Sequence, residues 1–560
     1  MNGRAWLVAG VLAATALSLA MRLPRLSDRP MHTDEAVQAV IAADLWQTGQ
    51  YRYDRTEYHG PTLPYLTQIS LRLSRASGFA DTTEAMYRIV PALAGAAMVL
   101  LVLLLADGLG RSATLWAAVL MAVSAGLSYY SRYFIHETLL ALFTLAAIAC
   151  GWRWYRDGGL GWAATTGACV GLMAATKETW VIAAACMGAA AIVDWRLRRL
   201  YSPLPAGGGR GEGAGAHPGA DTASPADADF DELGRVAHPR PLPWGQVGIA
   251  AGCAALVATV LFTSFLSNPR GILDAVLAWQ PYLSRSGGDP RHVHPWYFYL
   301  QPLLWQRYGR GPLFTEAFII GLAVVGAVAS FVRGRQMPLG RVLTFYTVFL
   351  TAAYAAIPYK TPWCMLGFLQ GMVLLAGIGA ATVIQAIPPA AGKWAAGALL
   401  AAGTAHLAWV SHNACFTYAA SRVNPYVYAH AASDILELEK RLRQLADVSP
   451  DGTNMPVRVF SDDPWPLPWY LRRLNKVGYW RDASIASARD DALVVIVSPE
   501  LDQAVMAGQQ ERYAQEYYWL RPEVPLLLYV RQDLWSAMLD RRRPGATVPA
   551  GHKEPPASGR

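Results

Sequence analysis

The chain has 560 residues, of which 53% are hydrophobic and only 16% are charged. In soluble domains about a quarter of all residues are charged. The lower charged fraction of this chain excludes an ordinary soluble protein and indicates a membrane protein. The net charge of +8 does not predict a nucleic-acid partner. Most basic residues lie in short connectors between apolar runs, where they orient a chain in the membrane.

Eleven apolar runs approach the roughly 17–25 residues that a membrane-crossing helix needs. The first run follows Arg4 and has no small-x-small cleavage site before Arg22, which favours an uncleaved signal anchor over a cleaved signal peptide. The sequence therefore predicts a polytopic α-helical membrane protein, with a transmembrane domain over residues 1–411. The predicted spans are 5–22, 88–107, 112–130, 137–152, 160–176, 179–194, 245–267, 313–332, 341–357, 363–386 and 394–411.

Basic residues in the short connectors predict the orientation of these spans. With the N-terminus inside, the inner connectors carry Arg111, Arg153, Arg156, Arg333, Arg335, Arg341 and Lys393, and the outer ones carry only Arg132, Lys177 and Lys360. Positive charge collects on the cytoplasmic side of membrane proteins, so the segment after the last span is expected outside. We expect a multi-pass protein of the inner (plasma) membrane, with membrane lipids around it.

The long connectors differ in character. Residues 195–244 are rich in Pro, Gly, Ala and Asp, which predicts a disordered cytoplasmic loop. Two large loops, 23–87 and 268–312, are assigned to the outside. The first contains an amphipathic stretch around residues 37–45 and the segment PTLPYLTQISLRL, which is too short and polar to span. Both predict helices lying at the membrane interface.

Beyond residue 411 the pattern becomes that of a mixed domain. SDILELEKRLRQLAD predicts an amphipathic helix, and MPVRVFS, ALVVIVS and PLLLYVR predict strands. We therefore expect a small extracytoplasmic α/β domain over residues 412–540 and a disordered tail over 541–560.

Nothing in the sequence indicates a cofactor. The six cysteines lie singly, mostly in or beside apolar runs, which favours packing over disulfides or a zinc site. His292 and His294 have the spacing of a metal-binding pair, but no third ligand accompanies them, so a divalent metal is not indicated. Trp296, like Trp465 and Trp469, fits either stacking on a sugar or an interfacial aromatic belt.

Acids, histidines and cations gather on the predicted outer side. Ionisable residues at a membrane boundary are costly and usually functional, so one outward-facing polar site built from several loops explains this gathering. The residues are Asp34, Glu35, His59, Arg88, Arg132, His136, Glu137, Lys177, Glu178, His292, His294 and Lys360.

Each motif also has a purely structural explanation. Asp34 and Glu35 follow Thr33 at the start of a helical pattern, where acids complement the helix dipole. Arg132 and His136 are four residues apart and fit a helix-capping pair. The segment TKETW fits a solvated turn. These alternatives stay open for each motif taken alone.

Taken together, the residues fit transfer of a group from a phosphate-linked donor. A departing phosphate needs charge stabilisation by Arg and Lys, and an acceptor hydroxyl needs a general base such as Asp. A soluble nucleotide sugar is confined to the cytoplasm, so an outward-facing site implies a lipid-phosphate donor. No Gly-rich phosphate loop is present to indicate ATP as the energy source.

Several motifs carry a resemblance to a known class. TDEA, YHGPTLPYL, YRIVPALAGA, SRYFIHE, TKE, PYKTPW and DPWPLPWYLRRL occur in an order, and on a predicted shared side, that resembles the GT-C class of integral membrane glycosyltransferases. The chain is similar to protein O-mannosyltransferases and lipid A aminoarabinose transferases. It is most similar to the flippase activity-associated protein family linked to archaeal glycosylation.

The resemblance implies roles for individual residues. Asp34 resembles the catalytic base, Glu35 the second acid of the pair, and Arg88 the arginine that opens the second span. His59 stands where the aminoarabinose transferases have a lysine that contacts the carrier phosphate. Because a histidine is only partly charged near neutral pH, the remaining charge is expected from Arg132, Lys177 and Lys360. His136, Glu137, Glu178, His292, His294 and Trp296 are assigned to support or to the acceptor side.

The predicted function is an inverting glycosyltransferase that moves a sugar from a polyprenyl-phosphate carrier to a glycan, lipid or protein acceptor at the extracytoplasmic face. The alternative is a lipid-linked-sugar translocator, or its accessory, without catalysis. A translocator typically shows inverted repeats or charges near mid-span, and neither is clear here.

The predicted topology is tested by single cysteines introduced at Ser284, Ser461 and Ser224 in a background without reactive native thiols. We expect a membrane-impermeant thiol reagent to label the first two in intact cells and to label Ser224→Cys only after the membrane is opened. Labelling of Ser224→Cys in intact cells would place the site on the cytoplasmic side and remove the basis for a lipid-phosphate donor.

Overall fold

The structure is a computed structural model that describes residues 3–55, 59–200, 243–280, 292–387, 390–484 and 490–542. Most of the loop predicted at 195–244, part of the 268–312 loop and nearly all of the tail predicted at 541–560 lie outside these residues. The chain forms two compact units. The helical unit comprises Met1–Arg29, Ile41–Ala76 and Thr82–Tyr428, and the sheet unit comprises Pro30–Val40, Ser77–Asp81 and Ala429–Arg560.

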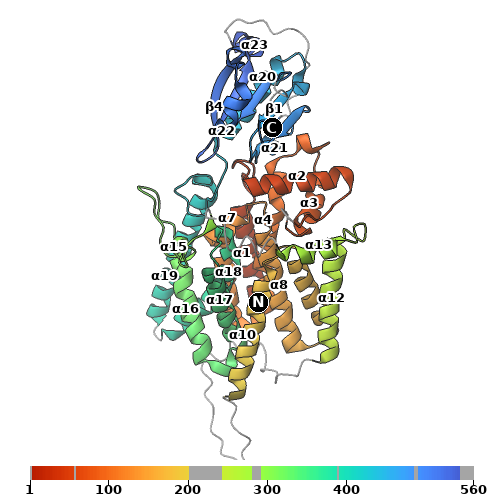
Figure 1. Cartoon of the computed structure of the whole chain (residues 1–560). Coiled ribbons are helices and arrows are strands. Elements are labelled where there is room, and N and C mark those ends of the chain that lie inside the picture. The colour runs from red at the N-terminus through yellow and green to blue at the C-terminus, as the bar shows by residue number, and fades with distance from the viewer. Residues whose placement is uncertain are drawn as a thin grey trace, which may run out of the picture. The chain divides into compact units, whose positions relative to one another are not determined.

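Every predicted span is helical, and the long helices of the helical unit run alongside one another (Figure 1). Seven segments among the described residues are long and apolar enough to cross a membrane, so the predicted count of eleven is not confirmed. Three further apolar helices, α6, α9 and α16, are shorter. The helices are α1 (Gly3–Arg22), α4 (Glu84–Leu101), α5 (Ala106–Leu109), α6 (Arg111–Val123), α7 (Ala125–Tyr130), α8 (Glu137–Asp157), α9 (Leu160–Ala174), α10 (Trp180–Leu200), α12 (Trp244–Phe262), α16 (Ala317–Val332), α17 (Pro338–Ala356), α18 (Leu366–Ala386) and α19 (Ala390–His412).

The run predicted as one span over 112–130 is divided at Ser124. The Ser124 hydroxyl accepts a hydrogen bond from Leu127 N at 3.4 Å and caps α7, so the helix axis restarts there. The predicted 88–107 span is likewise composite, with a short 3-10 turn, Val102–Leu105, between α4 and α5. Hydropathy alone predicts neither of these breaks.

Helix α18 forms the centre of the helical unit, packed against α6, α16 and α17. Helix α18 and the 3-10 turn that precedes it, Pro362–Met365, are almost entirely buried: 89% of their most apolar stretch lies inside the protein. Glycines permit the close approach: a Cβ on Gly379 would lie 1.9 Å from Leu322 O, and one on Gly326 would lie 1.9 Å from Leu375 O. Small residues at helix contacts allow such packing where no water drives helices together.

The first large loop contains the two predicted helices, α2 (Thr33–Thr48) and α3 (Thr62–Leu73). The start of α2, up to Val40, belongs to the sheet unit, and the remainder belongs to the helical unit. Short helices α13 (Gly271–Leu277) and α15 (Leu300–Leu304) lie in the described parts of the second large loop.

The sheet unit contains a five-stranded sheet of order β2-β1-β3-β5-β4. Strands β1 (Val457–Phe460), β2 (Val477–Trp480) and β3 (Val494–Val497) are parallel, and β5 (Val524–Arg531) and β4 (Tyr513–Arg521) are antiparallel to their neighbours. The predicted helix is α20 (Asp434–Val448), and α21 (Leu467–Tyr470), α22 (Pro499–Met506) and α23 (Gln532–Arg542) complete the unit. Prediction missed β2 and β4, whose exposed residues weaken the apolar strand pattern.

Candidate active site

The segment before α3 is attached to the turn between α9 and α10 by backbone hydrogen bonds. Gly60 N donates to Thr176 O at 3.1 Å, and Thr62 N donates to Ala175 O at 3.2 Å. The approach requires glycine, because a Cβ on Gly60 would lie 2.1 Å from Ala175 O. This pairing places His59 beside Lys177 and Glu178, although they are more than a hundred residues apart in the sequence.

Glu178 and His59 are hydrogen-bonded to each other at the edge of this turn. His59 Nδ1 donates to Glu178 Oε2 at 2.9 Å, and the Tyr53 hydroxyl donates to Oε1 at 3.0 Å. Burial favours the neutral acid, but His59 outweighs it, and the pKa of Glu178 is lowered to about 2. The carboxylate is 7% exposed and the imidazole 31% exposed, so His59 is the member that faces solvent.

His136 lies behind this pair. Its Nε2 donates to Gly60 O at 3.0 Å, and its ring meets that of His59 edge to face at 5.2 Å. Complete burial, followed by electrostatic interaction with His59 and Lys177, lowers the pKa of His136 well below its ordinary value. His136 is therefore a neutral imidazole that supports the 59–60 backbone. It does not pair with Arg132, whose side chain points to a different segment.

Lys177 and Glu137 form a buried ion pair, with exposed fractions of 7% and 6%. Burial lowers the pKa of Lys177, but the charge of Glu137 more than compensates and the net shift is upward. Lys177 therefore keeps its proton, and its charge is balanced by Glu137 before any substrate binds. A buried charge that is paired in this way stabilises the site only as long as both partners remain.

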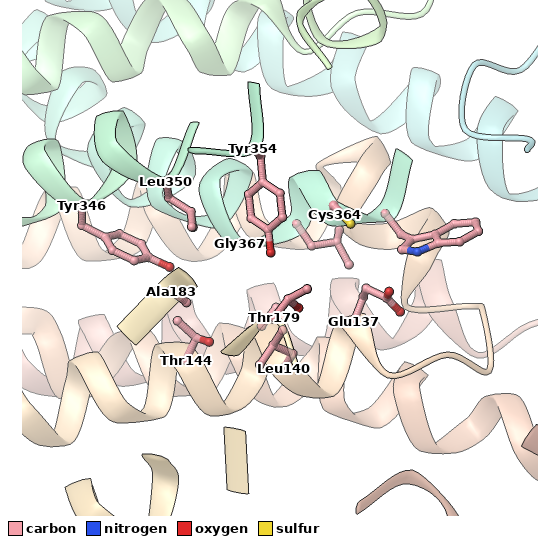
Figure 2. Close-up of a pocket in the computed structure, with 13 residues that line it drawn as sticks. Glu137, Leu140, Thr144, Thr179, Ala183, Tyr346, Leu350, Tyr354, Cys364 and Gly367 are labelled. Carbon is pink, nitrogen blue, oxygen red and sulfur yellow. The ribbon is translucent and has the colours of Figure 1, made fainter. Parts of the chain in front are cut away.

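A cavity opens beside Glu137 and extends between α8, α10, α17 and α18 (Figure 2). The space is small, and part of it is open to solvent. Leu140, Leu350, Ala183 and Gly367 form much of its wall, and the side chains of Tyr346 and Tyr354 point into it (Figure 2). The cavity thus joins the ionic cluster to an apolar interior.

Arg88 and Arg132 hold the chain between α1 and α2. Arg88 Nη1 donates to the carbonyls of Leu26 and Arg29 at 2.7 and 2.8 Å. Arg132 donates to the carbonyls of Arg22 and Pro24, both at 2.7 Å, and of Arg25 at 3.2 Å. A carbonyl oxygen satisfies a guanidinium N–H without cancelling its charge.

Four buried arginines gather in this region. Arg22, Arg29, Arg88 and Arg132 are all at most 8% exposed. Burial lowers the pKa of Arg132 to about 10, and the neighbouring Arg29 and Arg88 contribute to this effect. Arginines near the other ends of the helices pair with carboxylates: Arg153 with Asp107 at 3.2 Å and Arg341 with Asp194 at 2.7 Å.

Lys360, His292 and His294 meet where two loops pair. Lys360 N donates to His292 O at 2.9 Å, and Lys360 Nζ bonds to the carbonyls of His294, at 3.1 Å, and Ile357. The Tyr428 hydroxyl lies 2.7 Å from His292 Nδ1 and 3.4 Å from His294 Nε2. Burial lowers the pKa of Lys360, and burial together with His292 and Lys360 lowers the pKa of His294.

The predicted aromatic residues differ in their exposure. Trp296 is 66% exposed, which fits either predicted role, whereas Trp469 is fully buried and can neither stack on a sugar nor face lipid. Among the described residues, no group of three or more His, Cys, Asp or Glu side chains is arranged to hold a metal ion.

Asp34 and Glu35 belong to the sheet unit and differ sharply in their surroundings. Glu35 is fully buried, and its Oε2 accepts a hydrogen bond from His32 N at 3.0 Å, the arrangement of a capping box at the start of α2. The Asp34 side chain is 51% exposed. The structure therefore assigns the capping role to the second acid and leaves the first one accessible.

The predicted site residues thus fall into four groups. His59, His136, Glu137, Lys177 and Glu178 form one cluster; Arg88 and Arg132 a second; Lys360, His292 and His294 a third; Asp34 and Glu35 a fourth in the sheet unit. Sequence reasoning missed Tyr53, Arg22, Arg29, Tyr428 and Glu316. Glu316 is fully buried and accepts hydrogen bonds from Gly126 N at 2.7 Å and Ser124 Oγ at 3.0 Å. In the sequence, Glu316 stands out only as a single acid near the start of an apolar run, which is the feature that would have identified it.

Solved structures with this arrangement of helices define the class. The chain is similar to ArnT from Cupriavidus metallidurans bound to undecaprenyl phosphate, with 14% identity, a TM-score of 0.58, and coverage of 95% of this chain and 99% of that one. It is also similar to the Archaeoglobus fulgidus oligosaccharyltransferase tethered with an acceptor peptide, with 12% identity, a TM-score of 0.51, and coverage of 95% and 76%. The chain therefore has the fold of the GT-C class of integral membrane glycosyltransferases, as its motifs predict.

The sequence comparison points within that class. Residues 44–204 match the family model described as dolichyl-phosphate-mannose-protein mannosyltransferase. That range contains His59, Arg88, Arg132 and the Lys177–Glu178 turn. No curated protein sequence matches the chain.

The buried His136 predicts a loss of stability in acid. A histidine with a lowered pKa takes up its proton mainly in the unfolded state, so its contribution is present above the ordinary value of 6.5 and is lost as pH falls below it. The loss is about 1.4 kcal/mol per pH unit. Thermal unfolding in detergent between about pH 7.5 and pH 5 should show a shallower decline for His136→Gln than for the wild type. Parallel declines would contradict the buried neutral state.

Proposed function

We propose that the protein is an inverting glycosyltransferase that moves a sugar from a polyprenyl-phosphate carrier to an acceptor hydroxyl at the extracytoplasmic face of the inner membrane. Asp34 accepts the proton of the acceptor as its oxygen attacks the anomeric carbon, and polyprenyl phosphate departs. The observation that carries this proposal is the accessible Asp34 beside a buried, hydrogen-bonded Glu35. The acceptor is a glycan, a lipid or a protein.

The division of roles within the acidic pair supports Asp34 as the base. A general base must be reachable by the acceptor and must be able to change its protonation state without breaking the fold. Glu35 meets neither condition, because it is buried and its carboxylate holds the backbone of His32. Asp34 meets both, since its side chain is half exposed.

Cations that are not balanced by carboxylates support binding of the carrier phosphate. The charge of Lys177 is already balanced by Glu137, and His59 is bonded to Glu178. The side chains of Lys360 and Arg132 bond instead to carbonyl oxygens, so they retain their charge for an anion. We assign the main electrostatic role to Lys360 and Arg132, and a supporting role to Arg88, Lys177 and His59.

The cavity beside Glu137 supports a carrier with an apolar chain. Trp363, Cys364 and Gly367, which line it, follow Lys360 within a few residues. A phosphate held at Lys360 would therefore lie close in the chain to apolar side chains that can contact the first isoprene units. The bound undecaprenyl phosphate of ArnT, a protein of the same fold, is consistent with this assignment.

The role of Asp34 is tested by Asp34→Asn in a transfer assay with purified protein and a polyprenyl-phosphate sugar. Asn has nearly the same shape as Asp but cannot accept a proton, and the cap is made by Glu35, so activity should fall by ~10²-fold or more with unchanged stability and carrier binding. Asp44→Asn is the matched control, because Asp44 is an exposed acid on the same helix. Full activity of Asp34→Asn would contradict the mechanism, and carrier translocation without sugar transfer by the wild type would favour a translocator.

The role of Lys360 is tested by titrating Lys360→Ala with polyprenyl phosphate. Loss of a charged contact in a poorly hydrated site should weaken binding by about 2–4 kcal/mol. Lys393→Ala, an exposed lysine near the start of α19, should bind like the wild type. Because Lys360 also bonds to loop carbonyls, thermal unfolding is measured in parallel. Unchanged affinity in a folded Lys360→Ala protein would remove Lys360 from the carrier site.

A further inference from the structure

The sheet unit includes part of the first large loop as well as the C-terminal segment. Pro30–Val40, which carries Asp34, and Ser77–Asp81 pack with residues 429 onward as one compact unit. Met31, Ala36 and Ala39 are fully buried there, and His32 is 3% exposed. The proposed base therefore lies in the first turn of α2, and this turn belongs to the sheet unit.

The first contact is made by Tyr470 at the end of α21. Its hydroxyl accepts a hydrogen bond from Met31 N at 2.8 Å. Tyr470 is 3% exposed, and Met31 is the second residue before α2. A backbone N–H at this position has no partner within the helix, so the tyrosine satisfies it and fixes where the chain turns into α2.

The second contact is made by His430, just after the start of the C-terminal segment. Its ring meets that of His32 at 5.4 Å in an edge-to-face arrangement, and His430 is 2% exposed. His32 is in turn bonded to the two acids: its Nδ1 accepts from Asp34 N at 3.1 Å, and its own N donates to Glu35. His32 Nδ1 also lies 3.9 Å from Asp34 Oδ2. The imidazole therefore links the C-terminal segment to the Asp34 peptide.

A third set of contacts holds Ser77–Asp81, the other segment of the first large loop that belongs to the sheet unit. The rings of Phe79 and Trp469 are 5.7 Å apart, and Arg473 Nε donates to Ala80 O at 3.2 Å. Trp469 is fully buried and is covered on one side by the Arg472 guanidinium at 3.8 Å. The motif DPWPLPWYLRRL thus contacts both segments of the first large loop that belong to the sheet unit, which explains Trp469 and Tyr470 without a sugar or a lipid.

We propose that the C-terminal sheet unit positions the catalytic base, with Tyr470 and His430 acting on Asp34 through Met31 and His32. The inference rests on the proposed role of Asp34. Tyr470 and His430 are positioning residues: they touch the peptide that carries the base. A base displaced by a fraction of an ångström loses much of its effect, so these contacts contribute to turnover and leave carrier affinity unchanged.

The experiment compares Tyr470→Phe with Tyr517→Phe in the full-length protein. Tyr517 is 71% exposed and lies in the same unit, so it controls for removal of a hydroxyl. Tyr470→Phe should lower kcat for sugar transfer by ~10-fold, with unchanged KM for the polyprenyl-phosphate donor. Amide hydrogen exchange over residues 30–36 should become faster in the same variant. Unchanged kcat, or lost turnover with a proportional loss of carrier binding, would overturn the proposal.

His430 provides an independent test with rescue. His430→Ala removes the ring that contacts His32 and should reduce kcat, whereas His430→Phe keeps an aromatic edge there and should restore most of it. Equal loss in both variants would overturn the role of the ring contact. If the wild type transfers no sugar, the proposed function fails, and exchange over residues 30–36 still shows whether Tyr470 and His430 hold the segment. Unaltered exchange in both variants would refute the contacts themselves.

Discussion

The candidate site depends on the backbone pairing of Gly60 and Thr62 with the turn between α9 and α10. These two hydrogen bonds bring a segment of the first large loop against the Lys177–Glu178 turn. Once they are made, His59 meets Glu178, and His136 has a carbonyl to bind. The tight approach at Gly60 leaves no room for a side chain, so the whole ionic cluster relies on one residue that carries no charge.

Charge is managed differently at the two ends of the helices. Near Asp107 and Asp194, arginines are paired with carboxylates and their charge is balanced, as expected for structural ion pairs. Around the chain that leaves α1, Arg132 bonds to carbonyl oxygens, which satisfy its N–H groups and leave its positive charge in place. Burial lowers the pKa of Arg132 to about 10, which reflects the cost of holding a charge away from water. In the proposed function, that charge attracts the anionic carrier.

The two acids of the TDEA motif show how adjacent residues acquire separate functions. A helix places them about 100° apart, so one can face the packed interior while the other faces outward. Glu35 completes a capping box, and Asp34 keeps an accessible carboxylate. The cap is also a support, because the backbone it fixes is the backbone that carries Asp34.

Local pattern was enough to predict the long apolar helices, helix α20 and three of the five strands. Hydrophobic periodicity and run length are properties of short segments, so they can be read from the sequence. The identity of the ionisable residues also indicated a phosphate-handling site. Tertiary structure alone decided which of these side chains are exposed and which partners they bind. It balanced Lys177 with Glu137, turned Arg88 and Arg132 toward carbonyls, buried Glu35 and Trp469, and joined residues 30–40 to a domain that begins near residue 429. Each of these outcomes depends on burial and on partners distant in the chain, and a linear sequence contains neither.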